Sequence, residues 1–161
     1  MNNIKSSLRT EAEIIHLANQ KLTAAECLLS NGFYDEAYYI GGYVIELILK
    51  AKICKTLLIP DFFDFDNSKN RKLPTVKSKK SYNDNLYKSF KVHDYEQLLI
   101  LSGLFNAFLT KIEGDLVFSP NWSVIRVWDE SMRYVSGASK SEVESFIQSI
   151  KNIKSWFEQY L

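Results

Sequence analysis

The sequence predicts an all-α protein, and three observations carry this prediction. Several stretches place apolar residues at steps of three and four, which is the spacing of one face of a helix. Capping residues and glycines flank these stretches, and no stretch alternates polar and apolar residues as a half-buried strand does. A chain of 161 residues is long enough for one domain with a core. We therefore expect a single domain, residues 1–161, folded as an antiparallel bundle of four to five helices.

The first two helices are expected at residues 6–31 and from about 35 to 58. Gly32 follows the first helix as an ending residue, Asp35 is expected to cap the second, and Pro60 lies beyond its end. The buried stripe of the first helix is expected to consist of Leu8, Ala12, Ile15, Ala18, Leu22, Ala25, Leu28 and Leu29.

The second helix, which contains "AYYIGGYVIELILKAKICK" at 37–55, is apolar nearly all round. Such a helix is either central in its bundle or buried on its second face by another subunit. Gly41 and Gly42 lower its helix propensity, so they either allow a neighbour to approach closely or produce a kink. Glu46 and Lys50 stand inside this run, one helical turn apart. An exposed pair at this spacing adds only about 0.2–0.5 kcal/mol, which does not explain two charges in an apolar helix.

Residues 60–91 are expected to form a long loop between the second and third helices. From 67 to 91, eight basic residues stand against Asp84 alone, so this segment carries +7 and the rest of the chain −6. The segment is either a solvated flexible loop or a patch for nucleic acid. The basic residues are Lys69, Arg71, Lys72, Lys77, Lys79, Lys80, Lys88 and Lys91.

Three further helical regions are expected. One helix runs from His93 or Asp94 up to Gly114, and two short helical pieces joined by extended chain follow at 115–137, a region broken by Pro120. Ser139 and Glu142 then form a capping box at the start of the last helix. The buried face of this helix is expected to hold Val143, Phe146, Ile150, Ile153 and Phe157.

Several signatures of known chemistry are missing from the sequence. It has no zinc-ligand spacing, no glycine-rich phosphate loop and no nucleophile elbow, so we expect neither a metal nor a cofactor. Cys27 and Cys54 are expected to be buried free thiols. The N-terminus has no apolar signal region and charges interrupt every apolar run, so a cytoplasmic protein without membrane contact is expected.

The candidate site residues are polar and aromatic. His93 and Asp94 stand at the start of a helix, where Asp caps and backbone N–H groups attract anions. His93 either carries protons or makes a cap or a tertiary hydrogen bond. In "WDESMRY", Trp128, Arg133 and Tyr134 either form a unit that stacks on bases and holds phosphate, or Arg133 pairs with Glu46.

Taken together, "LLSNGFYDEAYYIGGYVIELILKAKICK", "HDYEQLLILSGL", "WDESMRY" and a last helix ending near Trp156 resemble the HEPN domain family, over residues 22–161. The resemblance implies a bundle of four to five helices that is commonly a homodimer. It also implies one of several roles. Some members are metal-independent endoribonucleases of toxin–antitoxin, CRISPR or abortive-infection systems, others accompany a minimal nucleotidyltransferase, and others bind nucleotides or substrates without catalysis.

The chain departs from the ribonuclease members of this family. These carry an Arg and, after four to six residues, a His near the start of the last long helix, and no His follows Arg133 here. Arg9 and His16 have this spacing but lie in the first expected helix. Without an imidazole at the usual place, acid–base cleavage of RNA loses its proton carrier.

Three hypotheses follow. The first is a non-catalytic module that binds a nucleotide, RNA or a partner protein in a cleft lined by Glu46, Lys50, His93, Arg133 and Tyr134. The second is an endoribonuclease toxin that uses His93, or Arg9 with His16, and the third is a purely structural interaction protein. We expect Glu46 to bind Arg133 or His93, and Lys50 to face the cleft.

Overall fold

The computed structural model of the protein describes residues 10–59 and 92–161. The expected loop 60–91, its basic segment, Arg9 and the first residues of the first expected helix therefore lie outside the described residues. The described part is all-helical, with six α-helices, one short 3-10 helix and no strand. Its elements are α1 (Glu11–Ser30), α2 (Tyr34–Leu57), α4 (Tyr95–Leu101), α5 (Phe105–Gly114), α6 (Phe118–Ile125), η2 (Glu130–Tyr134) and α7 (Lys140–Glu158).

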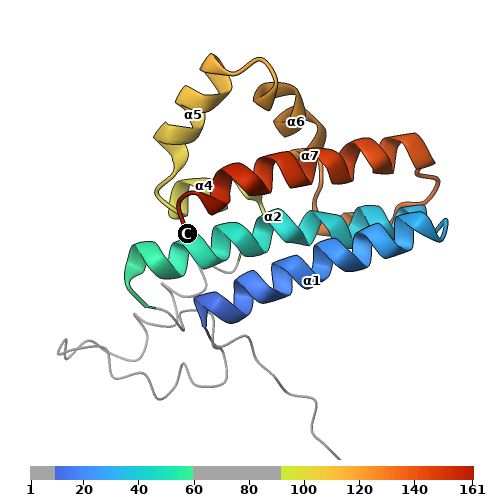
Figure 1. Cartoon of the computed structure of the whole chain (residues 1–161), viewed down its shortest axis with the longest axis horizontal. Helices are drawn as coiled ribbons and strands as arrows, with labels where there is room; N and C mark the ends of the chain where they lie inside the picture. The colour runs from blue at the N-terminus through green and yellow to red at the C-terminus, as the bar shows by residue number, and fades with distance from the viewer. Residues whose placement is uncertain (1–9, 60–91) are drawn as a thin grey trace, which may run out of the picture.

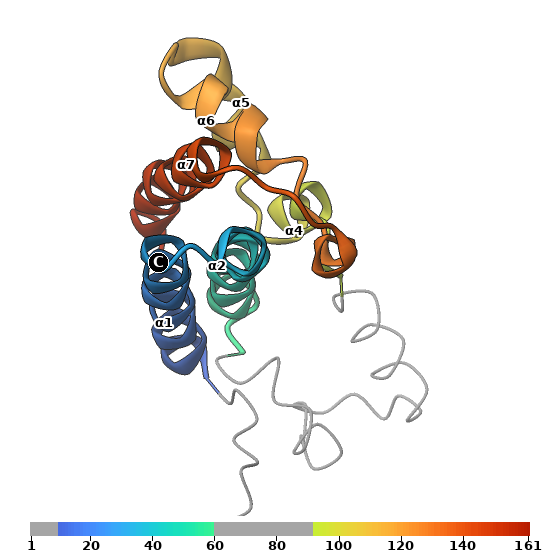
Figure 2. The ribbon, with the colours of Figure 1, turned by 90° about the vertical axis from the view of Figure 1, so that its right-hand side faces the viewer.

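Three long helices form the body of the protein (Figures 1 and 2). α1 and α2 are an antiparallel pair joined by a short turn, and α7 packs against both of them while running in the same direction as α2. α4 and η2 pack on α2, and α6 packs on α7. The helical bundle is thus confirmed. The described chain has six α-helices where four to five were expected, because the middle of the sequence folds as short pieces.

α1 and α2 begin and end for local reasons. Thr10 caps α1 with a capping box to Glu13, and Gly32 adopts a positive φ of 83° in the turn after it. α2 has Phe33 at its N-cap with no side-chain cap, so the expected capping role of Asp35 is wrong. The Asp35 carboxylate instead accepts hydrogen bonds from the backbone N–H groups of Gly137 and Ala138, at 3.2 and 2.8 Å.

α2 is the central helix, which accounts for its apolar composition without another subunit. Gly41 and Gly42 allow close approach, as one of the two sequence interpretations proposed. A Cβ at Gly41 would lie 3.3 Å from Ile150 Cδ1, and a Cβ at Gly42 would lie 2.0 Å from Trp128 Cε2. The indole of Trp128 therefore lies directly on the backbone of α2.

The single helix expected at 93–114 is interrupted. α4 ends at Leu101 and α5 starts at Phe105, because Gly103 adopts a φ of 77° that a helix does not permit. The Thr56 hydroxyl of α2 donates to the carbonyl of Ser102 at 2.9 Å and holds the break in place.

The rest of the chain follows the expectations more closely. Two short helical pieces, α6 and η2, occupy the region 115–137. Pro120 lies in the first turn of α6, where a backbone N–H would have no hydrogen-bond partner within the helix, so proline is tolerated there. Ser139 and Glu142 form the predicted capping box of α7. The predicted apolar face of α7 is buried in full.

The structure also bears on the expected burial of the two cysteines and on the expected absence of a membrane span. Cys54 is buried as predicted, but Cys27 is exposed, because it falls on the outer side of α1. Within the described ranges, no helix is long and apolar enough to cross a bilayer.

Candidate functional site

Glu46 is the centre of a polar network inside the bundle. Its side chain projects from α2 and is 4% exposed. Oε1 lies 2.6 Å from the Lys50 Nζ, and Oε2 lies 3.0 Å from the His93 Nδ1. A buried carboxylate requires such partners, since an unpaired charge in the core is strongly destabilising. The expected contact between Glu46 and His93 is present.

His93 joins three elements. It precedes α4, its Nδ1 contacts Glu46 on α2, and its Nε2 lies 3.2 Å from Glu130 Oε2 in η2. Both ring nitrogens of His93 thus lie within hydrogen-bond distance of a carboxylate. Asp94 is the N-cap of α4, where its carboxylate accepts from the N–H of Gln97 at 2.8 Å.

The three residues of "WDESMRY" do not form one unit. Trp128 is only 3% exposed, and its ring is stacked on Tyr95 at a centroid distance of 5.5 Å. Its expected role as a stacking surface for bases is therefore wrong. Arg133 is exposed, with its guanidinium 5.0 Å from the ring centre of Tyr134, which is 80% exposed.

The predicted pairing of Arg133 with Glu46 is not formed, and that of Arg9 with His16 lies partly outside the described residues. Among the described residues no ion pair joins Arg133 to Glu46, whose carboxylate binds Lys50 and His93 instead. His16 lies on the exposed side of α1, and its proposed companion Arg9 is outside the described residues.

The surface beside His93 is acidic. A hollow of ≈ 530 Å³ there is lined by four carboxylate side chains, with Arg126 and His93 as its basic residues. Phosphate groups are repelled by such a surface. The carboxylates belong to Asp94, Glu96, Asp129 and Glu130.

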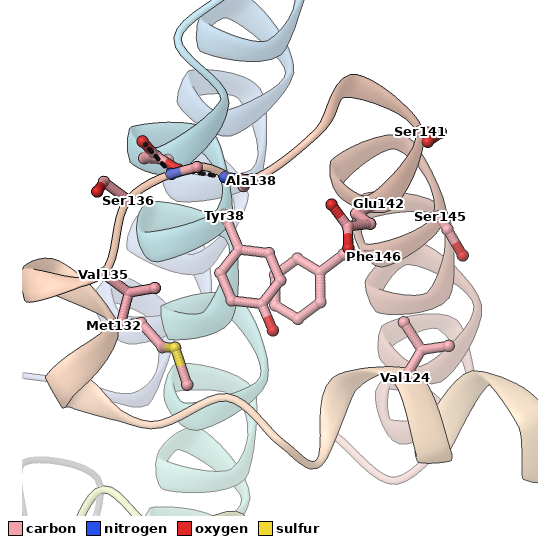
Figure 3. Close-up of a pocket in the computed structure, with 12 residues that line it drawn as sticks. Tyr38, Val124, Met132, Val135, Ser136, Ala138, Ser141, Glu142, Ser145 and Phe146 are labelled. Carbon is pink, nitrogen blue, oxygen red and sulfur yellow. Dashed lines mark hydrogen bonds between the residues drawn. The ribbon is translucent and has the colours of Figure 1, made fainter.

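A larger cavity lies between α2 and α7, on the other side of η2, and is called the α2–α7 cavity below (Figure 3). Its volume is ≈ 610 Å³, within the range of small-molecule sites. Tyr38 and Phe146 stack on each other at 4.0 Å in its floor. Its wall is mostly apolar and consists of Asp35, Tyr38, Val124, Met132, Val135, Ser136, Gly137, Ala138, Ser141, Glu142, Ser145 and Phe146.

Asp35 fixes one wall of this cavity. Its hydrogen bonds from Gly137 and Ala138, drawn as dashed lines in Figure 3, tie the turn 135–138 to the start of α2. Neither Lys50 nor any other residue of the Glu46 network lines the cavity.

Two residues that line the cavity, Tyr38 and Glu142, have shifted pKa values. Hydrogen bonds from the Ser139 side chain and backbone lower the pKa of Glu142, so this carboxylate stays ionised. Burial, together with the charges of Asp129 and Glu142, raises the pKa of Tyr38, so its hydroxyl stays protonated.

Sequence reasoning missed this cavity. Its lining comes from four separate segments, and no single motif contains them. The only local signals are Tyr38, in the turn of α2 before the two glycines, and the small residues Ser136, Gly137 and Ala138.

Over residues 10–59 and 92–161 the structure is all-helical, and it contains the internal polar network of Glu46 and the open, largely apolar α2–α7 cavity. No group of three or more His, Cys, Asp or Glu side chains in the described part of the chain is placed to hold a metal ion. Comparison of the chain with family models, with curated proteins and with solved structures gives no match in any of the three.

Proposed function

We propose that the protein is a non-catalytic binding module with a HEPN-like helical fold, and that a ligand binds in the α2–α7 cavity. The observation that carries this proposal is the cavity itself. It combines a volume of ≈ 610 Å³ with an apolar wall and a few polar groups, and this combination is typical of ligand sites.

The polar network supports the non-catalytic part of the proposal. A general acid or base needs one free atom directed at its substrate. In the described structure Glu46 is buried between Lys50 and His93, and His93 contacts a carboxylate through each nitrogen. These contacts hold α2, α4 and η2 together, so the network has a structural role.

Other predicted partners stay predictions. Binding of a nucleotide or RNA rests on the family resemblance and on the basic segment 67–91, which lies outside the described residues. The homodimer, the nucleotidyltransferase partner and a toxin–antitoxin setting rest on the resemblance alone. The described residues carry fifteen Asp and Glu against ten Lys and Arg, a balance that disfavours phosphate at their own surface.

The binding proposal is tested with a neutral probe, 2-methyl-1-phenylpropan-2-ol, added to ¹⁵N-labelled full-length protein. We expect saturable shifts of the backbone amide signals from Val135 to Glu142. Val135→Trp places an indole in the cavity and should abolish them. Val127→Trp is the matched control, because Val127 is 59% exposed, Val135 is 56% exposed, and only Val135 lines the cavity. Absence of saturable shifts in the wild type would refute the proposal.

The ribonuclease alternative is tested with a mixed RNA pool. Wild-type protein and His93→Gln should both leave the pool intact. Cleavage by the wild type that disappears in His93→Gln would show that the protein is a catalyst and that its imidazole takes part.

A further inference from the structure

We propose that the α2–α7 cavity selects small organic cations that carry an aromatic or branched apolar group. This inference rests on the proposed function, because it names the class of ligand for the same cavity.

The charge of the cavity wall is the first argument. Asp35 and Glu142 line it, and no Lys, Arg or His is among its described lining residues. Asp129 lies close enough to influence Tyr38 and adds a third negative charge to the surroundings. A carboxylate or phosphate ligand would be repelled, whereas a cation would be attracted.

The N-terminal ends of α2 and α7 both lie at the cavity and oppose this field, and each carries a carboxylate, Asp35 or Glu142, in its first turn. A helix N-terminus is equivalent to roughly half a positive charge. At α7, the Glu142 carboxylate accepts the N–H of Ser139 at 2.8 Å and its full negative charge stands in the first turn. The net charge of the helix end and its carboxylate at this end of the cavity is therefore negative.

The carboxylates keep free positions for a ligand. An ionised carboxylate has about four acceptor sites. Asp35 uses one acceptor site on each oxygen to accept the backbone N–H groups of Gly137 and Ala138. The remaining positions leave room for an ammonium or guanidinium donor.

The floor of the cavity suits the rest of such a ligand. The stacked Tyr38 and Phe146 offer an aromatic surface that attracts cations and apolar groups alike. Met132, Val124 and Val135 surround this pair, as Figure 3 shows, and the flexible thioether of Met132 adapts to different shapes.

Three probes of similar size test the inference by isothermal titration calorimetry on the full-length protein. They are benzyltrimethylammonium, the neutral 2-methyl-1-phenylpropan-2-ol and the anion 3-phenylpropionate. We expect the cation to bind at least about tenfold more tightly than the neutral alcohol, and the anion to give no measurable binding.

Glu142→Gln removes one charge while keeping an amide that can complete the capping box. It should weaken binding of the cation about tenfold and leave the neutral probe unchanged. Glu144→Gln is the matched control, because Glu144 lies on the same helix outside the cavity, and it should change neither affinity.

The outcomes separate the two proposals. If all three probes bind equally, or if Val135→Trp does not abolish binding of the cation, the inference is wrong while the neutral-probe result still decides the proposed function. If none of the probes binds, both are wrong.

Discussion

The contact between Gly42 and Trp128 yields the sharpest test of the fold. A Cβ at position 42 would lie 2.0 Å from Trp128 Cε2 and 2.2 Å from its Nε1, so Gly42→Ala forces the indole out of its place. Displacing a buried Trp forfeits packing whose complete loss costs about 3–5 kcal/mol. Alanine returns about 1 kcal/mol of helix propensity. We expect Gly42→Ala to lower the free energy of unfolding by about 3 kcal/mol.

Gly41→Ala is the matched control on the same helix. Its Cβ would lie 3.3 Å from Ile150 Cδ1 and Phe146 Cε1, which are side-chain atoms that can shift by a few tenths of an ångström. The gain in helix propensity offsets this small strain, so we expect a change of less than about 1 kcal/mol.

Urea unfolding followed by circular dichroism measures both variants, and thermal unfolding should show a fall in Tm of about 6–12 °C for Gly42→Ala. The double variant with Trp128→Leu isolates the contact, because removing the indole should make Gly42→Ala nearly neutral. Equal stability of the two glycine variants, or additive effects in the double variant, would refute the reasoning.

Three further predictions concern single carboxylates. Glu46→Ala removes the buried carboxylate that pairs with both Lys50 and His93 and should destabilise the protein by about 3 kcal/mol in urea unfolding. Glu130→Ala, at a half-exposed position, should cost less than about 1 kcal/mol. Similar losses for the two variants would contradict the argument that burial makes the Glu46 contacts the stronger ones. Asp35→Ala leaves the backbone N–H groups of Gly137 and Ala138 without their acceptor and should lower the free energy of unfolding by about 1–3 kcal/mol. Hydrogen exchange in the turn 135–138 should become faster, and unchanged exchange there would contradict the prediction. Hydrogen bonds from Lys111 and from backbone N–H groups lower the pKa of Asp115 from 3.8 to about 2, so its stabilisation is present above pH 4 and is lost as the pH falls toward 2. The Tm difference between wild type and Asp115→Asn should shrink over that pH range, and a constant difference would be contrary to this assignment.

The long helices were predictable because their signals are local. α7 has a capping box at Ser139 and apolar residues at helical spacing, and each signal acts within a few residues. The same holds for α2, whose all-round apolar composition indicated either a central position or burial by another subunit, and the helix is central.

The break between α4 and α5 was not predictable in this way. Apolar residues continue at helical spacing through Ser102 and Gly103, so periodicity alone favours one helix. The interruption occurs where Gly103 adopts a positive φ, and the carbonyl of Ser102 accepts a hydrogen bond from Thr56, which lies 46 residues away in the chain.

The candidate site was predictable only in part. The position of Glu46 in an apolar helix indicated a buried partner, and His93 is one. Two other contacts depend on how the helices meet in space. They are the contact of His93 with Glu130, and the packing of Trp128 on the backbone at Gly42. Local patterns carry no information on either contact.

The hydrogen bonds of Asp35 also bear on the order in which the protein folds. They join Asp35 to Gly137 and Ala138, which are separated from it by 102 and 103 positions in the chain. We therefore expect them to form only after most of the chain has been brought together. The α1–α2 hairpin closes over a far shorter separation, so we expect it to form first. We therefore predict that the α2–α7 cavity forms late in folding, after the hairpin. A ligand of this cavity should therefore slow unfolding strongly while leaving the folding rate almost unchanged.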